Sequence, residues 1–252
     1  MQKRNTQQRR HAIVTLLGEF GEVTVEDLAR RYETSEVTIR KDLVALEANG
    51  LLLRRYGGAI PLPSEMAQEP QLSGAKLAIG QAAAARIRDH ARIIIDSGST
   101  TAALIPELAA KRGLVVMANS LNVVAALREL ENEPTILMTG GTWDPHSESF
   151  QGQVAERVLR SYDFDQLFIG ADGVDLARGT TTFNELVGLS RVMADVAREV
   201  VVMVESTKIG RRIPNLELGW QQVNTLITDA ALDSAIRQQI ADLGVEVVLA
   251  GA

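Results

Sequence analysis

The sequence predicts an α/β protein in two parts, a small helical N-terminal domain and a larger domain built on a mostly parallel sheet. In residues 1–58, three segments have apolar residues at helical spacing and are followed by a short basic stretch. From residue 92 onward, short β-branched runs alternate with segments of helical composition, as in a parallel sheet covered on both faces. A chain of 252 residues is long enough for one small and one ordinary domain.

The first 58 residues predict a winged helix-turn-helix. A first helix is expected over roughly 9–18 and a second over 25–32, each with apolar residues on one side. A third helix begins beside Ser35, whose hydroxyl can accept hydrogen bonds from the free amides of the first turn, and it ends at Gly50. The apolar and basic stretch that follows, residues 51–58, is typical of a wing.

The third predicted helix has a buried face and a polar, cationic face. The apolar positions expected in the core are Ile39, Leu43 and Leu46. Thr38, Arg40 and Lys41 lie near the helix start, where a recognition helix contacts base edges and phosphates of double-stranded DNA. The alternative is an ordinary helical bundle whose basic residues are only solvated, because helix-turn-helix spacing is moderately specific.

Composition excludes several classes of site. The chain contains no cysteine, so disulfides, thiol catalysis and cysteine-based zinc sites are excluded. The histidines at positions 11, 90 and 146 are scattered without metal-ligand spacing, so no metal site is expected. No apolar run approaches the roughly 18 residues that span a membrane, and the N-terminus lacks a signal-peptide core, which predicts a cytoplasmic protein without a membrane partner.

The net charge of −6 is divided unevenly along the chain. Residues 1–58 hold 10 basic and 8 acidic residues, a net charge of +2, whereas residues 59–252 hold 16 and 24, a net charge of −8. An acidic body discourages general adhesion to DNA and leaves the small basic end to dock.

Prolines at positions 61, 63 and 70 in a polar stretch predict a linker over 59–73, between a DNA-binding domain at 1–58 and a second domain at 74–252. Seven short apolar runs in the second domain are expected to be strands. They lie within residues 92–98, 114–120, 134–141, 165–173, 199–206, 223–229 and 245–251. Helices are expected between them, for example over 101–111, 121–130 and 184–198.

Polar residues follow several of these runs, at the edge of the sheet where α/β proteins bind ligands. Residues 96–101, Asp-Ser-Gly-Ser-Thr-Thr, combine a glycine, hydroxyls and the free amides of a following helix, which favour a phosphate. Lys208 is the only lysine at a strand end and could neutralise phosphate charge. The other candidates are Asn119, Gly140, Gly141, Asp172, Asp175, Asn184 and Glu185. Each alone has a simpler explanation as a turn former or a solvated charge, but together they favour a phosphorylated polyhydroxy ligand.

These residues stand in motifs that resemble a known family along nearly the whole chain. TIRKDLVALEANG with RRYGGAI resembles the N-terminal signature of DeoR-type, GlpR-like bacterial repressors. DSGSTT, NSLNVVAAL, GGT with SFQG, FIGADGVD, GTTTFNE and STKIGR are similar to that family's sugar-phosphate sensor domain, whose fold resembles the ribose-5-phosphate isomerase superfamily. The stretches NSLNVV, LENEPTILMTGG and DGVDLARGTTTFNE are most similar to the branch of the family that controls glucitol (sorbitol) operons.

The resemblance implies a non-enzymatic repressor of a carbohydrate operon, without a cofactor, that acts as a dimer or tetramer. A phosphorylated sugar or polyol, such as glucitol 6-phosphate, would release it from DNA, although the residues leave open whether the effector induces or co-represses. By position, the DNA-binding residues would be Ser35, Thr38, Arg40, Lys41, Arg54 and Arg55. The effector-binding residues would be Asp96, Ser97, Gly98, Ser99, Thr100, Thr101, Asn119, Gly140, Gly141, Asp172, Glu185 and Lys208.

Two departures from the family pattern bear on the ligand. Residues 143–146, Trp-Asp-Pro-His, stand where members commonly have a basic residue, which leaves the sugar unassigned. Glu205 stands where the family usually has Asp.

An alternative function is an active sugar-phosphate isomerase with an attached DNA-binding domain, in which Asp172, Asp175, Glu185 and Lys208 supply acid, base and electrophile. A purely architectural DNA protein would not account for the polar strand ends.

Overall fold

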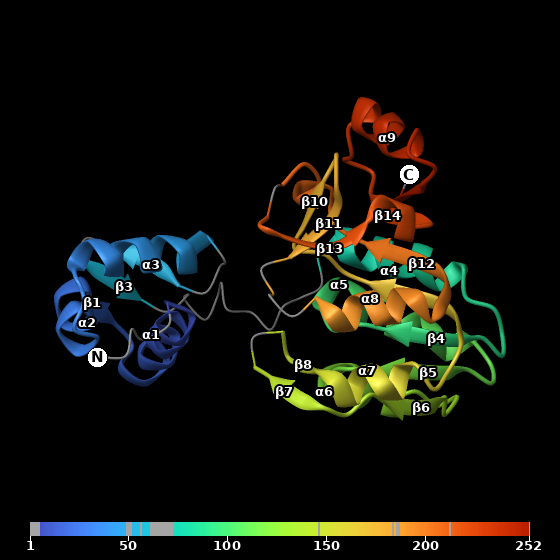
Figure 1. The fold of residues 1–252 in the computed structure, drawn as a ribbon, viewed down its shortest axis with the longest axis horizontal. Coiled ribbons are helices and arrows are strands. Elements are labelled where there is room, and N and C mark those ends of the chain that lie inside the picture. Colours follow the sequence, from blue (N-terminus) through green and yellow to red (C-terminus); the bar gives the residue numbers. More distant parts are fainter. Residues whose placement is uncertain are drawn as a thin grey trace. The chain divides into compact units, whose positions relative to one another are not determined.

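The computed structural model describes residues 6–48, 52–55, 57–60, 73–145, 147–182, 184, 187–211 and 213–251. The chain forms two compact units, residues 1–71 and 72–252 (Figure 1).

The N-terminal unit is a winged helix-turn-helix, as predicted. Its elements are α1 (Thr6–Phe20), β1 (Val23–Thr24), α2 (Val25–Arg31), α3 (Glu36–Ala48), β2 (Leu53–Arg55) and β3 (Gly58–Ile60). The first helix is longer than expected at both ends. The wing strands β2 and β3 pair antiparallel, and β1 pairs with the other side of β3. A side chain at Gly58 would meet the carbonyl of Val23 at 2.1 Å, so this pairing requires glycine there.

A small apolar core and one buried ion-pair cluster hold the N-terminal unit together. The core contains Ile39, Leu43 and Leu46, which confirms the buried face predicted for α3. Asp42, on the same helix, is 1% exposed and accepts hydrogen bonds from Arg9 Nε at 2.6 Å and Arg10 Nε at 2.8 Å. These bonds connect α3 to α1 and leave the opposite side of α3 to solvent.

The second unit is built on a seven-stranded sheet in which every neighbouring pair is parallel. The strands are β4 (Arg92–Ile95), β5 (Val115–Ala118), β6 (Thr135–Met138), β9 (Phe164–Ile169), β12 (Ala197–Met203), β14 (Thr225–Asp229) and β15 (Glu246–Ala250). Each of the seven predicted runs overlaps one of these strands, although β9 and β12 begin one and two residues before their predicted runs. The order is β15-β14-β12-β9-β4-β5-β6, so the chain winds in one direction from β4 to β6 and in the other from β9 to β15.

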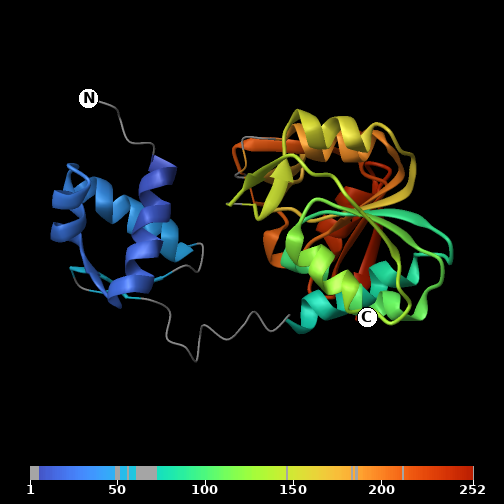
Figure 2. The same ribbon diagram turned by 90° about the horizontal axis from the view of Figure 1, so that it is seen from below.

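Helices cover both faces of the sheet (Figure 2). One core cluster includes residues of α4 (Gly74–Ala85), the 3-10 helix η1 (Ile105–Ala110) and α6 (Leu121–Arg128). The other includes residues of α7 (Gln153–Leu159), α8 (Gly188–Asp195) and α9 (Ser234–Ala241). Burial on both faces explains why the strand runs are continuously apolar rather than alternating.

Two predicted helices were wrong in part. Residues 101–111 form not one helix but the end of the four-residue α5 (Ser99–Ala102) and then η1, because Pro106 has no amide hydrogen for an α-helical bond. In the segment 184–198, α8 ends at Asp195, and Ala197 and Arg198 already belong to β12.

Three further parts of the second unit were not predicted. β7 (Thr142–Asp144) and β8 (Ser149–Gln151) form an antiparallel hairpin after β6. β10 (Gly173–Asp175), β11 (Gly179–Thr182) and β13 (Asn215–Gly219) form a small antiparallel sheet. Short 3-10 helices, η2 (Ser206–Lys208) and η3 (Trp220–Gln222), follow β12 and β13.

The linker predicted over 59–73 overlaps described elements at both ends. Ala59 and Ile60 belong to β3, and Ser73 caps α4. Residues 61–72 lie outside the described residues, so the domain boundaries stay a prediction. Within the described part of the chain, no helix is long and apolar enough to cross a membrane.

Candidate functional site

The start of α3 presents the predicted DNA-binding side chains. Ser35 Oγ accepts a hydrogen bond from the Thr38 amide at 3.2 Å, which confirms Ser35 as the cap, and lies 2.9 Å from Thr38 Oγ1. Arg40 and Lys41 are exposed, and Arg40 Nη2 pairs with Glu36 one turn earlier at 2.6 Å. Surface pairs of this kind contribute little to stability, so Arg40 can exchange Glu36 for a phosphate at small cost.

The wing arginines have different surroundings. Arg54 donates from its backbone amide and from Nε to the carboxylate of Glu47, in the last turn of α3, at 3.0 and 2.6 Å. These hydrogen bonds lower the pKa of Glu47. Arg54 therefore also fixes the wing to the helix, while Arg55 is exposed on the same strand. The predicted wing residues Leu51 and Tyr56 and the predicted helix end Gly50 lie outside the described residues.

The second candidate site lies at the switch point of the sheet, between β4 and β9, where the order of strands along the chain reverses. β4 is bordered by β9 on one side and β5 on the other, and the chain leaves this point in opposite directions. Ligands of open α/β sheets bind outside the carboxyl ends of the strands at such a switch point. Residues 96–101 follow β4 and residues 170–172 follow β9, so the topology places both predicted loops there.

Asp96 and Asn119 form the centre of this site. Asp96 is two residues after Ile94, and Asn119 two after Met117, so the strand pleat directs both to one face. Asn119 Nδ2 donates to Asp96 Oδ1 at 2.7 Å, and Asn119 Oδ1 accepts from the Ser97 amide at 3.0 Å. Burial raises the pKa of Asp96 to about 6, although hydrogen bonds to its carboxylate from Asn119 and Ser97 oppose the shift.

The hydroxyl groups in and after the loop that follows β4 differ in burial and in hydrogen bonding. Thr101 is fully buried and its Oγ1 donates to the carbonyls of Asp96 and Gly98 at 2.8 and 2.9 Å, so it closes the loop on itself. Gly98 has φ of +132°, which side-chain-bearing residues rarely adopt. Thr100 is 5% exposed, whereas Ser99 is exposed. Because α5 has only four residues, its dipole adds little for an anion, contrary to the expectation from a long helix.

A lysine that the sequence reasoning missed reaches this loop. Lys76, on α4, donates from Nζ to Ser99 Oγ at 3.0 Å and lies 3.9 Å from Glu205. It is the only charged residue of α4, which is otherwise composed of small, apolar and amide residues. A single charge in such a helix was the available signal.

Lys208 lies on η2, after β12, and is half-buried. Its Nζ donates to the carbonyl of Ala171, in the loop after β9, at 3.0 Å. Burial lowers the pKa of Lys208, which the negative charges of Asp172 and Glu205 partly oppose. A desolvated ammonium group of this kind gains from an anionic partner.

Other predicted residues have partners that favour a structural role. Asp172 is exposed and accepts a hydrogen bond from Thr182 Oγ1 at 2.8 Å. Asp175 is 3% exposed and binds Arg178 Nε at 2.8 Å in the β10–β11 turn, which does not suit the acid–base role of the isomerase alternative. Glu185 lies outside the described residues. Asn184 is half-buried, and its carbonyl accepts from Asn215 Nδ2 at 3.0 Å.

The glycine pair after β6 leads into the unpredicted hairpin. Gly140 and Gly141 both have positive φ, and a side chain at Gly141 would meet the carbonyl of Gln151 at 2.6 Å. Asp144, in the departure from the family pattern, accepts from Ser147 Oγ at 2.7 Å across the hairpin turn. Its carboxylate therefore stabilises the turn.

A second residue missed from the sequence is Glu217, on β13. It is 8% exposed and accepts hydrogen bonds from Ser190 Oγ at 2.8 Å and Thr180 Oγ1 at 3.3 Å. Burial, and then the negative charges of Asp96 and Asp172, raise the pKa of Glu217 to about 7. Nothing in the local sequence NLELG distinguishes this glutamate from a solvated one.

The N-terminal unit is a helix-turn-helix with an exposed basic helix start, and the second unit is an α/β fold with hydroxyls and two lysines at its switch point. This pairing is typical of a ligand-responsive regulator. Comparison with known families agrees. The DeoR-like helix-turn-helix domain matches residues 9–65, and the DeoR C terminal sensor domain matches residues 72–230. The chain belongs to the DeoR family of transcriptional regulators.

Relatives with assigned names are similar along nearly their whole length. The putative aga operon transcriptional repressor of Escherichia coli O157:H7 is 36% identical over 255 residues, covering 98% of this chain and 94% of the relative. The HTH-type transcriptional regulator GlpR of Haloferax volcanii is 31% identical, with 96% of each chain covered. Among solved structures, ribose 5-phosphate isomerase A of Methanocaldococcus jannaschii is 20% identical with a TM-score of 0.38 over 53% of each chain, too low to support an argument about activity.

Proposed function

We propose that this protein is a transcriptional repressor of a carbohydrate operon that binds operator DNA through α3 and the wing and is released by a phosphorylated sugar or polyol. The observation that carries the proposal is the pairing of the two DeoR-family domains on one chain. A repressor acts on the chromosome, so a cytoplasmic location is part of the proposal.

The DNA-binding part rests on the start of α3. Thr38, Arg40 and Lys41 occupy its first turns, where side chains reach base edges and phosphates in the major groove. One small unit makes few contacts, so specific binding requires a second copy on a paired half-site, and we propose a homo-oligomer for this reason.

The effector part rests on the two lysines. Lys76 extends from α4 and contacts the loop after β4, and Lys208 extends from η2 and contacts the loop after β9. Their charges suit a phosphate, and the amide and carboxyl groups of Asn119 and Asp96 suit hydroxyls of the carbon chain. Glucitol 6-phosphate is the first candidate, on the sequence resemblance alone, and hexose and pentose phosphates are the others.

The test is binding of the purified protein to DNA from upstream of its own gene, titrated with each sugar phosphate at one fixed salt concentration. We expect specific binding that one phosphate abolishes and the unphosphorylated sugar does not. Specific binding that no sugar phosphate weakens would contradict the effector part. Turnover of a sugar phosphate without specific DNA binding would instead support the isomerase alternative.

Point variants separate the two parts. If Arg40 contacts a base, Arg40→Ala should weaken operator binding by about 1–3 kcal/mol. If Arg40 contacts a phosphate, the variant should instead reduce the slope of log affinity against log salt concentration by about 1. Lys208→Ala should bind operator normally and lose its response to the effector. A normal effector response in Lys208→Ala would show that Lys208 does not bind the phosphate.

A further inference from the structure

The first turn of α4 is the point at which the chain enters the sensor unit from residues 61–72. In the chain, this turn is therefore the part of the sensor unit that directly follows the segment leading from the DNA-binding unit. The contacts of Ser73, the residue that caps α4, are for this reason a candidate relay between effector and DNA.

Ser73 connects α4 to Glu205, beside the candidate effector site. Ser73 Oγ donates to Glu205 Oε1 at 2.9 Å and accepts from the Lys76 amide at 3.2 Å. Lys76 Nζ contacts Ser99 Oγ at 3.0 Å and lies 3.9 Å from Glu205 Oε2. The start of α4, Glu205 and the loop after β4 thus share one set of polar contacts.

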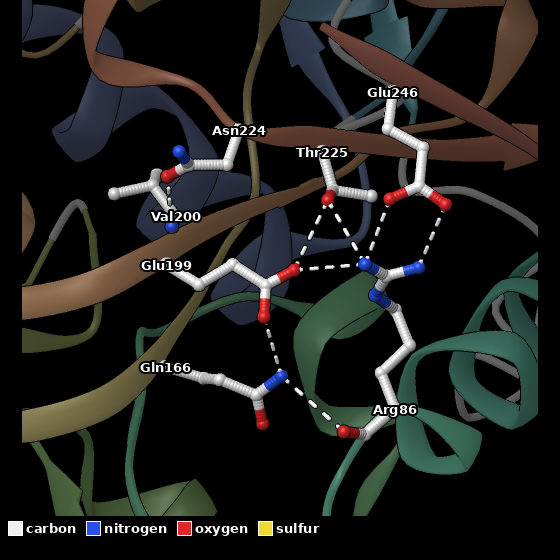
Figure 3. Close-up of polar contacts among 7 residues, drawn as sticks. All are labelled: Arg86, Gln166, Glu199, Val200, Asn224, Thr225 and Glu246. Atoms are coloured by element: carbon white, nitrogen blue, oxygen red, sulfur yellow. Dashed lines mark hydrogen bonds and ion pairs between the residues drawn. The ribbon is translucent and has the colours of Figure 1, made fainter.

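The rest of α4 is held more firmly. A side chain at Gly80 would meet the carbonyl of Ala103 at 2.4 Å, so the helix lies directly against the backbone that follows α5. At the other end of the helix, Arg86 binds both carboxylate oxygens of Glu246 at 3.0 and 2.8 Å, and Glu199 at 2.9 Å (Figure 3). Displacement is therefore easiest at the first turn, where the bonds are fewer and exposed.

An anion bound beside Lys76 and Ser99 changes the surroundings of Glu205. It competes with Glu205 for the charge of Lys76, and it places a second negative charge near the carboxylate. Both effects disfavour the arrangement in which Glu205 accepts the Ser73 hydroxyl.

We propose, building on the function above, that the Ser73–Glu205 contact relays effector binding to the linker: the effector anion displaces Glu205 and loosens the first turn of α4. Ser73 and Glu205 are positioning residues in this mechanism. The contact belongs to the arrangement that the effector disfavours, which for an inducer is the one that binds operator. Because coupling is reciprocal, loss of the contact weakens operator binding, strengthens effector binding and reduces the effect of each ligand on the other.

The first test is hydrogen exchange of the Lys76 and Leu77 amides in the full chain, with and without glucitol 6-phosphate and the other sugar phosphates. The two amides donate hydrogen bonds to the hydroxyl and the carbonyl of Ser73, respectively. Because the proposal loosens this turn when a phosphate is bound, we expect both amides to exchange faster in its presence. Unchanged exchange with a phosphate that demonstrably binds would overturn the relay, even if that phosphate releases operator. Faster exchange without operator release would support the relay and contradict the repressor function.

Two variants and a control test the coupling itself. Ser73→Ala removes the contact, and Glu205→Gln keeps an acceptor for Ser73 but removes the charge that the anion repels. Asp233→Ala is the matched control, because Asp233 caps α9 by accepting from Ala235 and Ile236 amides and loss of a cap has a similar cost. Effector affinity is measured by calorimetry with and without operator.

We expect Ser73→Ala to bind operator about 5-fold more weakly than the wild type, the size of a modest exposed hydrogen bond. Both site variants should show a smaller change in operator affinity on adding effector, while Asp233→Ala keeps the wild-type values. Wild-type coupling in either site variant would overturn the proposal. If none of the sugar phosphates binds, equal operator affinities of Ser73→Ala and Asp233→Ala would overturn it as well.

Discussion

Replacing Glu217 by Gln should make the sensor unit more resistant to unfolding at pH 8. Glu217 is a buried carboxyl group, and among the residues that the structure describes it has no cationic partner and accepts hydrogen bonds only from Ser190 and Thr180. At high pH its charge must remain in the interior, near the negative charges of Asp96 and Asp172. Glutamine keeps the shape and an acceptor for Ser190, and it carries no charge.

The sign and size follow from the pKa. Burial raises the pKa of Glu217 from an ordinary 4.5 to about 7 in the folded protein. Between these values the folded state holds a proton that the unfolded state has released, so the free energy of unfolding falls as the pH rises through this window. A difference of about 2.5 pH units, at about 1.4 kcal/mol each, gives an order-of-magnitude loss of about 3 kcal/mol.

The assay is urea unfolding of wild type and Glu217→Gln at pH 5 and pH 8, followed by tryptophan fluorescence. The tryptophans of the chain are Trp143 and Trp220, both in the sensor unit, so the signal reports that unit alone. Glu131→Gln, at an exposed position, is the matched control. We expect Glu217→Gln to gain stability relative to wild type between pH 5 and pH 8, and the control to gain none. A difference between Glu217→Gln and wild type that is the same at both pH values would refute the reasoning.

Two further predictions concern ion pairs. Asp42→Ala should destabilise the N-terminal unit by about 3–5 kcal/mol, because it leaves the buried Arg9 unpaired. Proteolysis of that unit should accelerate with no change in tryptophan fluorescence. Resistance to proteolysis equal to that of the wild type would contradict this. Arg86→Met should destabilise the sensor unit by about 1 kcal/mol at pH 7, a modest value because the groups are partly exposed. Burial alone would raise the pKa of Glu199, but hydrogen bonds from Gln166 and Arg86 lower it. The loss of stability caused by Arg86→Met should therefore shrink as the pH falls below 4.5. Urea midpoints of wild type and Arg86→Met at pH 7 and pH 4 check this.

Most of the fold could be predicted because its signals are local. Apolar spacing in 1–58 placed the three helices and the wing, and the seven apolar runs each overlap a strand of the parallel sheet. Elements that depend on pairing with distant strands escaped prediction. β13 is only five residues long and pairs with β11, more than 30 residues earlier in the chain, so no local pattern marks it.

The candidate site divides in the same way. Residues at strand ends could be predicted, because the carboxyl ends of parallel strands meet at one edge of the sheet. The sequence also suggested hydroxyls such as Thr101, yet the structure directs that hydroxyl to its own loop. Lys76 and Glu217 come from elements outside the motif loops, and only packing brings them to the site.

The sequence by itself therefore determined the family, the two kinds of domain and the loops that face the switch point, because motif and periodicity are properties of neighbouring residues. The tertiary structure decided which charges act together. Burial of Glu217, desolvation of Lys208 and the contact of Ser73 with Glu205, 132 residues away along the chain, arise only when separate elements pack. Electrostatic free energies depend on distance and on exclusion of water, and neither quantity exists before the chain has folded.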